Sequence, residues 1–198
     1  MTDLILASAS RHRASLLESA GLTFAQISSE LDERAIEAPL AAADVPADDR
    51  AEILAEAKAT DVSDNNPHHL VIGCDQILSI DQQILHKCTD MAQARRRLLQ
   101  LSGRTHFLHS AIVLVQGGTT LWRHTTTCAM TMRNLSPEFI GRHLSDVGET
   151  VLSSVGVYQI EGQGIQLFEK IEGDHFSIIG LPILPLLKQL RQIGAIDG

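Results

Sequence analysis

Three consecutive basic residues, Arg11, His12 and Arg13, lie where a strand is expected to pass into a helix, in the segment LILASASRHRASLL of residues 4–17. The N-terminal end of a helix carries unpaired N–H groups and about half a positive charge, so it favours acidic rather than basic neighbours. An anion bound at this turn would contact both the N–H groups and the basic side chains. The turn is therefore predicted to bind an anion, and replacing Arg13 is predicted to leave the stability of the ligand-free protein level or higher.

Two lysines also lie beside expected helices. Lys87 comes just before a helix that Thr89 could cap, so a cation again precedes a helix start. Lys58, in LAEAKA, lies one helical turn beyond Leu54. If that face of the helix is buried, the ammonium group needs an anionic partner. Alternatively, Ile53 and Leu54 belong to the true core face, and Lys58 extends from its edge into solvent.

Carboxylates occur in two places that could support catalysis. Asp75 ends the apolar run of HLVIGCD, at the expected end of a strand, where open α/β sheets bind their ligands. Alternatively, it is a turn aspartate that caps nearby N–H groups. Glu30, Asp32 and Glu33 form either a solvated loop or a magnesium site. Cys74 allows a separate interpretation of the function, a thiol-dependent hydrolase that Cys74→Ser would inactivate. A buried cysteine without a catalytic role is, however, commoner in a strand.

These side chains must be positioned by an alternation of strand-like and helix-like segments, which predicts an α/β fold. VQGGTTL and LSIDQQIL each predict a hairpin, so the sheet should be mixed. Gly21, Gly103 and Gly194 follow apolar helical runs as stop signals, while Asp48 and Thr89 are expected helix caps. The segment EAPLAAADVPADD is predicted to be a loop and a mobile flap over a site.

Composition excludes several classes of function. The 198 residues carry a formal charge of −8, which opposes non-specific binding to nucleic acid or to an acidic membrane surface. An acid stands where a secretory signal would carry positive charge, and no apolar run reaches the length of a membrane span, so a cytoplasmic protein is expected. The three cysteines form no C-x-x-C pair, which supports neither a disulfide framework nor a zinc site.

The segments considered so far resemble one family. LILASASRHRASLL resembles the opening motif of the Maf nucleotide pyrophosphatases, L-A-S-x-S-P-R-R. SELDE, LAEAKA, GCD, HKCTDMAQARRRLLQLSGRTH and YQIEGQGIQLFEKIEGDHFSIIGLP resemble its later motifs in the same order. Several positions depart from the family pattern: Arg11 replaces a proline, His12 replaces an arginine, Cys88 replaces the proline after the lysine, and Ser154 stands where a lysine is frequent.

This resemblance implies an elongated mixed sheet flanked by helices, with two lobes around a central cleft, in one domain that spans residues 1–198 and forms a homodimer. It also implies hydrolysis of nucleoside triphosphates between the α and β phosphates with Mg²⁺ or Mn²⁺. The residues implied at the metal and the attacking water are Glu33 and Asp75. Those implied on the phosphates are Lys58 and Lys87. Those implied at the phosphate turn are Ser8, Ser10 and Arg13.

Two further positions resemble the branch of the family that is associated with 7-methyl-GTP rather than with dTTP or UTP. Gln76 follows the aspartate where the pyrimidine branch has threonine, and Glu161 stands where that branch has glutamine. Both are therefore expected to contact the substrate. The altered S-R-H-R and H-K-C segments leave one alternative, a nucleotide-binding regulator of cell division with weak or absent catalysis.

Overall fold

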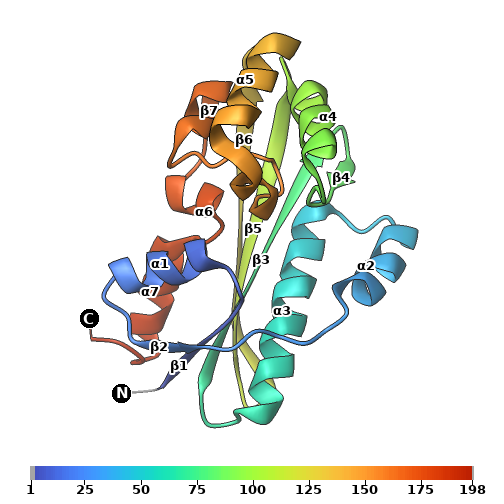
Figure 1. Cartoon of the computed structure of the whole chain (residues 1–198). Coiled ribbons are helices and arrows are strands. Elements are labelled where there is room, and N and C mark those ends of the chain that lie inside the picture. Colours follow the sequence, from blue (N-terminus) through green and yellow to red (C-terminus); the bar gives the residue numbers. More distant parts are fainter. Residues whose placement is uncertain (1–2, 198) are drawn as a thin grey trace. The chain divides into compact units, whose positions relative to one another are not determined.

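The computed structural model describes residues 3–197, and its helices and strands are labelled in Figure 1. Within these residues, seven strands form one sheet, in the order β2-β1-β3-β5-β6-β7, with β4 paired to β3. The strands are β1 (Leu4–Ala7), β2 (Phe24–Gln26), β3 (Leu70–Ile80), β4 (Gln83–Leu85), β5 (Thr105–Gln116), β6 (Thr119–Met132) and β7 (Phe168–Glu172). β1 pairs in parallel with β2 and β3, whereas β3 with β4 and β6 with β7 are antiparallel, so the predicted mixed α/β sheet is confirmed.

Helices alternate with strands along most of the chain, as the sequence pattern predicts, and α6 and α7 follow the last strand. The longer ones are α1 (Arg11–Ser19), α2 (Glu33–Ala42), α3 (Ala47–Asn65), α4 (Met91–Leu101), α5 (Pro137–Val147) and α7 (Ile183–Gln192). The shorter ones are α6 (His175–Ile179) and the 3₁₀ helices η1 (Gly148–Ser153) and η2 (Gln163–Leu167). Among the helices of residues 3–197, none combines the length and the apolar character that crossing a membrane requires.

The chain divides into two compact units. The first contains the N-terminal residues through Gln76, then His109–Thr127, then the C-terminal residues from Asp174. The second contains Ile77–Leu108 and Cys128–Gly173. The division between them falls within β3, β5 and β6.

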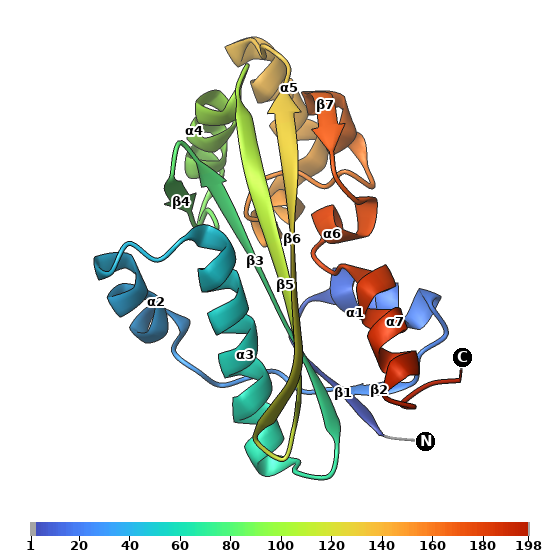
Figure 2. The same cartoon turned by 180° about the vertical axis from the view of Figure 1, so that it is seen from behind.

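In the first unit, helices cover both faces of β1 and β3, as the two opposite views show (Figures 1 and 2). Leu17 of α1 and Leu186 of α7 belong to one buried cluster with Ile72 and Cys74 of β3. α3 covers the other face, and its buried residues recur at the spacing of an amphipathic helix: Ala51, Leu54, Ala55, Lys58, Ala59, Val62 and Ser63. In the second unit, α4, α5 and η1 pack against one another.

Both predicted hairpins are present. Gly117 and Gly118, between β5 and β6, have φ angles of 55° and 72°. Asp81 and Gln82, between β3 and β4, have φ angles of 47° and 66°. Two consecutive residues with positive φ form the two-residue turns whose twist matches that of antiparallel strands. The turn chemistry of the sequence therefore predicts both connections correctly.

Three local predictions are wrong. The segment EAPLAAADVPADD, residues 37–49, is not a single loop, because α2 continues through Pro39 to Ala42 and α3 begins at Ala47. α3 begins at Ala47 with Pro46 as its cap residue, so Asp48 lies inside its first turn. α4 is capped by Asp90 rather than Thr89, since the Asp90 side chain accepts a hydrogen bond from the Gln93 N–H at 2.7 Å.

Candidate active site

Lys58 is the centre of the candidate active site. It lies on the buried face of α3 and is 9% exposed, so the interpretation in which it extends into solvent is wrong. Its Nζ atom lies 2.6 Å from Oδ1 of Asp75 and 3.0 Å from Oε1 of Glu33. A buried ammonium group requires such partners. The sequence thus correctly predicts that a buried Lys58 needs an anionic partner.

Asp75 reaches Lys58 because α3 lies unusually close to β3. Residues 73 and 75 point to the same face of the strand. A Cβ atom at Gly73 would lie 2.1 Å from the carbonyl oxygen of Ala55 and 2.7 Å from Cβ of Ala59, so only glycine allows this approach. Lys58 lies one helical turn after Ala55 and thus on the same face of α3. Asp75 lies two residues after Gly73 and thus on the same face of β3. The close contact therefore aligns the ammonium group with the carboxylate.

Asp75 lies within a strand rather than at its end. β3 continues through it to Ile80, so the interpretation as a turn aspartate is wrong. The neighbouring strand ends earlier, because the last pair between β1 and β3 joins Ala7 to Gly73. Asp75 therefore lies two residues beyond the end of β1, beside the turn that leads into α1. The strand that ends beside Asp75 is therefore β1, and not β3 itself.

Glu33 is the member of the acidic stretch that joins Lys58. It is the first residue of α2, and Asp32 caps that helix by accepting hydrogen bonds from the N–H groups of Arg34 and Ala35. The Glu33 side chain is 53% exposed, whereas those of Lys58 and Asp75 are buried. The cluster thus combines a buried ion pair with one carboxylate that solvent can reach.

The cluster has one ammonium group and two carboxylate groups. Burial alone would lower the pKa of Lys58, but the adjacent Asp75 and Glu33 carboxylates outweigh it and raise that pKa above its usual value. Lys58 is therefore charged at neutral pH, and the three groups together carry one net negative charge. Such a site attracts cations and still offers one positive group to a phosphate.

The turn after β1 gathers Ser8, Ser10 and Arg13, as the resemblance implies. The Ser10 side chain caps α1 by accepting a hydrogen bond from the Arg13 N–H, and the Ser10 N–H donates to Oγ of Ser8 at 3.2 Å. The Arg13 guanidinium group donates to Oγ of Ser8 at 3.2 Å, to the Cys74 carbonyl at 3.0 Å and to the Gly180 carbonyl at 2.9 Å. These protein oxygens thus explain why a basic side chain, Arg13, is stable near the start of a helix. These contacts argue against the expectation that its removal leaves stability level or higher.

Gln76 lies on the face of β3 opposite Asp75. Its side-chain amide group donates hydrogen bonds to Oγ of Ser110 at 2.9 Å and to the carbonyls of Ser177 and Ile178 at 3.1 and 3.0 Å. These acceptors are more than thirty residues away along the chain, and no local pattern in the sequence identifies them. The Gln76 side chain therefore connects β3 to α6 through hydrogen bonds.

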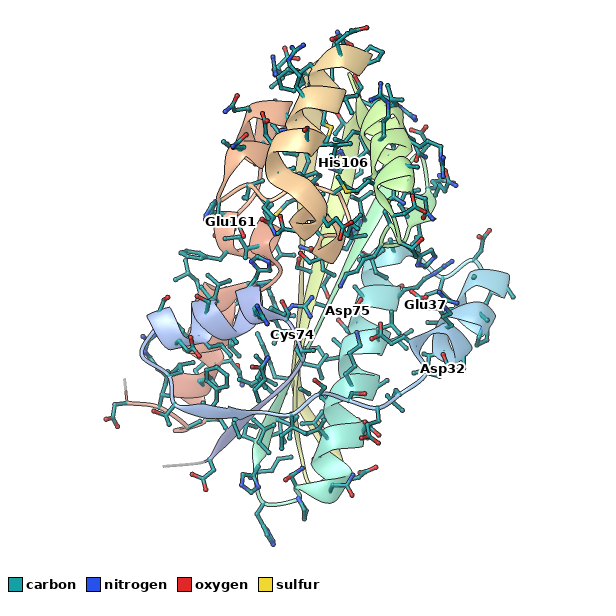
Figure 3. All side chains as sticks on the ribbon, viewed as in Figure 1. Asp32, Glu37, Cys74, Asp75, His106 and Glu161 are labelled. Atoms are coloured by element: carbon teal, nitrogen blue, oxygen red, sulfur yellow. The ribbon has the colours of Figure 1, made fainter. Side chains whose placement is uncertain are left out.

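Cys74 also lies on the face opposite Asp75, and both residues are labelled in Figure 3. Its side chain is fully buried. Burial raises the pKa of the Cys74 thiol to about 11, so it stays protonated at neutral pH. A buried, protonated thiol is a poor nucleophile, and the structure therefore opposes the thiol-dependent interpretation.

Lys87 and Glu161 belong to the second unit. Lys87 is exposed and lies between β4 and α4, and Glu161 is exposed in the turn between η1 and η2. The described contacts therefore bring together Glu33, Lys58 and Asp75 in one cluster, and Ser8, Ser10 and Arg13 in the adjacent turn. A separate surface pocket, lined in part by Trp122 and Leu184, contains none of the predicted site residues.

The donor atoms of the cluster fit a hard divalent cation. Within residues 3–197, no group of three or more His, Cys, Asp or Glu side chains is arranged to hold a metal ion. Mg²⁺, however, is commonly held by one or two carboxylates together with water and substrate phosphates. Glu33 and Asp75 supply two carboxylates that share one ammonium partner. These two residues would hold the metal.

Together, the mixed sheet and the Lys58 cluster define an α/β protein with a charged site suited to a phosphate ester and a cation. The family model of the Maf-like proteins matches residues 3–193, and the chain belongs to this family. A protein of Mesorhizobium japonicum named 7-methyl-GTP pyrophosphatase is 59% identical over 100% of both chains. Proteins with the same name from Brucella suis and Brucella abortus are 57% and 56% identical over 98% of this chain and 98% of their own.

Solved structures give a weaker likeness. A nucleoside-triphosphatase, described as a dITP/XTP pyrophosphatase, from Mycobacterium abscessus is 15% identical and has a TM-score of 0.42 over 98% of this chain and 97% of its own. The sheet order and the helices define the fold of this chain.

Proposed function

We propose that this chain is a nucleoside triphosphate pyrophosphatase that hydrolyses 7-methyl-GTP to 7-methyl-GMP and pyrophosphate. The observation that carries the proposal is the buried Lys58 between the carboxylates of Asp75 and Glu33. Full-length relatives named 7-methyl-GTP pyrophosphatase support the choice of substrate. The family resemblance adds a homodimer and a requirement for Mg²⁺ or Mn²⁺ to the proposal, and the sequence adds a cytoplasmic location.

In the proposed reaction, water attacks the α phosphorus, and the bond from that phosphorus to the oxygen bridging the α and β phosphates breaks. The Asp75 carboxylate accepts a proton from the water, and pyrophosphate leaves with the bridging oxygen. The Lys58 ammonium group stabilises the negative charge that grows on the phosphates, because its burial weakens screening by solvent. A bound Mg²⁺ or Mn²⁺ would neutralise further phosphate charge.

Residues of the adjacent turn would bind the polyphosphate chain. Ser8 and Ser10 present hydroxyl groups at the start of α1, where the N–H groups of a helix favour anions. Arg13 holds this turn beside β3 through the Cys74 carbonyl, one residue from Asp75. In this proposal Lys87 contributes a second cation to the phosphates.

The base preference rests on Glu161. A carboxylate can accept hydrogen bonds from N1 and the exocyclic amine of guanine, whereas uracil and thymine present mainly carbonyl acceptors to it. Methylation at N7 makes the guanine ring cationic, which adds a favourable interaction with the same carboxylate. Glu161 is exposed in the turn between η1 and η2. Gln76, the other position that resembles the 7-methyl-GTP branch, donates its side-chain N–H groups to Ser110 and to α6.

The test is a panel of nucleoside triphosphates that includes 7-methyl-GTP, GTP, dTTP and UTP. Purified protein is assayed with Mg²⁺, with Mn²⁺ and with EDTA, and the products are separated by ion-exchange chromatography. We expect 7-methyl-GTP to have the highest kcat/KM and to yield the monophosphate and pyrophosphate in equal amounts. Binding without release of pyrophosphate would instead support a nucleotide-binding regulator.

Two variants assign the activity to the Lys58 cluster. Asp75→Asn should lower kcat about 100-fold or more, the range expected when a general base is lost. Asp49→Asn, an exposed position in the first turn of α3, is the matched control and should retain full activity. A folded Asp75→Asn protein with unchanged kcat would remove Asp75 from the mechanism.

A further inference from the structure

A buried hydrogen bond joins His106 to Tyr158 in the second unit. His106, on β5, is fully buried, and its Nε2 atom lies 2.7 Å from the Tyr158 hydroxyl group. Within residues 3–197, Nδ1 of His106 has no hydrogen-bond partner. The Tyr158 ring packs edge-on against Phe168, with 4.8 Å between the ring centroids. Losing one partner of this buried polar contact is costly, because the other partner is then left unpaired away from solvent.

The residue before Tyr158 has a strained backbone. Val157 is fully buried and has a φ angle of 62°, in the left-handed region that a β-branched side chain disfavours. Such a conformation persists only when its surroundings enforce it, and it occurs most often at functional sites. Val157 adjoins Tyr158 directly, so the hydrogen bond to His106 is one of the contacts that can enforce it.

Further contacts hold the same segment. A Cβ atom at Gly156 would lie 2.2 Å from the Tyr158 ring, so the ring packs directly onto the backbone there. The Arg97 guanidinium group donates a hydrogen bond to the Val155 carbonyl at 2.7 Å. The segment from Val155 to Tyr158 is therefore fixed by α4, β5 and its own packing, more tightly than a simple surface connection requires.

The fixed segment leads directly into the turn that carries Glu161. The Gly162 N–H donates a hydrogen bond to the Gln159 carbonyl at 3.2 Å, which closes a turn with Ile160 and Glu161 at its centre. Ile160 is buried and Glu161 is exposed. Tyr158, which is buried, comes directly before this turn.

We propose that the His106–Tyr158 hydrogen bond is a positioning device for the Glu161 turn and thereby sets the selectivity of the protein for the nucleobase. His106 and Tyr158 act through the backbone of this turn and do not contact the substrate themselves. The inference rests on the proposed function, because it takes Glu161 as the group that contacts the base. Figure 3 labels both His106 and Glu161.

The test uses Tyr158→Phe, which removes only the hydroxyl group and keeps the ring. Isothermal titration calorimetry measures binding of the α,β-methylene analogues of 7-methyl-GTP and UTP, which are not hydrolysed. We expect the variant to bind the 7-methyl-GTP analogue about 10-fold more weakly and the UTP analogue within about twofold of the unmutated protein, the scale of one lost hydrogen bond. Glu161→Gln removes the proposed contact with the base directly and is the reference variant. It should also reduce the ratio of the affinity for the 7-methyl-GTP analogue to the affinity for the UTP analogue.

Two more variants separate positioning from stability. His106→Phe/Tyr158→Phe replaces both polar partners, which should restore much of the stability lost in Tyr158→Phe. We expect its selectivity to stay low, because the rings no longer have a directional contact. Ile140→Val, a buried change in α5, is the control for stability and should leave selectivity unchanged. In assays of hydrolysis, Tyr158→Phe should raise KM for 7-methyl-GTP with little change in kcat.

The outcomes distinguish this inference from the proposed function. If the unmutated protein prefers the 7-methyl-GTP analogue but releases no pyrophosphate, the proposed function fails and the binding ratio still tests the inference. Unchanged selectivity in Tyr158→Phe, or selectivity that returns with stability in the double variant, would overturn the inference alone. An unmutated protein with no preference between the two analogues would overturn both the base assignment and the inference.

Discussion

Replacing Lys58 by methionine tests the most deeply buried part of the site. Methionine keeps an unbranched side chain of similar length and removes the charge. The Asp75 carboxylate, 8% exposed, would then remain buried without its cation. Removing one partner of a buried ion pair typically costs about 3–5 kcal/mol. Because Glu33 is half exposed and can be solvated, we expect a loss near the lower limit, about 3 kcal/mol.

Urea unfolding at pH 7 and 25 °C measures this loss. The double variant Lys58→Met/Asp75→Leu should recover most of it, because an apolar pair often replaces a buried ion pair at little cost. Lys170→Met is the matched control, since Lys170 pairs with Glu172 at 2.9 Å on the surface, and its effect should be within about 1 kcal/mol. Neither Lys58 variant should hydrolyse nucleotides at a significant rate.

The stability data can contradict this interpretation independently of activity. If Lys58→Met is as stable as the unmutated protein, the ammonium group does not neutralise a buried Asp75. If the double variant is no more stable than the single one, the loss comes from packing of the lysine side chain rather than from an unpaired carboxylate. Either result would refute the charge argument on which the site is built.

Two further predictions concern stability. Arg13→Ala should lower the free energy of unfolding of the ligand-free protein by about 2 kcal/mol, because its charged hydrogen bonds are lost, and urea unfolding would show no loss if the turn depends only on a bound anion. Burial lowers the pKa of His106 to about 4, below the value near 6.5 expected in the unfolded chain, so the unfolded state binds the extra proton first as the pH falls. Stability should therefore decrease from about pH 6.5 toward pH 4, with about 3 kcal/mol lost at pH 4, and His106→Phe should remove this component from the measured pH dependence.

Local features that depend on neighbouring residues could be predicted from the sequence. The two hairpins follow from turn residues that adopt positive φ angles. Gly21, Gly103 and Gly194 also have positive φ angles, as predicted for residues that follow helices. The requirement of Lys58 for an anionic partner follows from its place on an apolar helical face. In each case the deciding interaction lies within a few residues of the chain.

The rest could not be predicted because it depends on distant segments or on weak preferences. α2 was expected to be a loop because proline disfavours a helix interior, but a helix with Asp32 as its cap continues through Pro39. The acceptors of the Gln76 side-chain amide group, Ser110 and Ser177, are far away along the chain. The hydrogen bond between His106 and Tyr158 likewise joins two segments that no periodic pattern relates.

Contacts on both sides of Asp75 along β3 explain how a single carboxylate can be held in place. Before it, the Cys74 carbonyl accepts a hydrogen bond from Arg13, which also donates to the Gly180 carbonyl just after α6. After it, the Gln76 side chain donates to the carbonyls of Ser177 and Ile178 within α6.

Residues 74 and 76 of β3 are thus attached to the segment of residues 177–180, on the face of the strand opposite Lys58. The Asp75 side chain projects the other way, toward α3. Under the proposed function, Arg13 could therefore act on catalysis by contacting phosphate, by positioning Asp75, or by both. A rise in KM alone after Arg13→Ala would indicate a lost substrate contact. A matching fall in kcat would indicate that the carboxylate has moved.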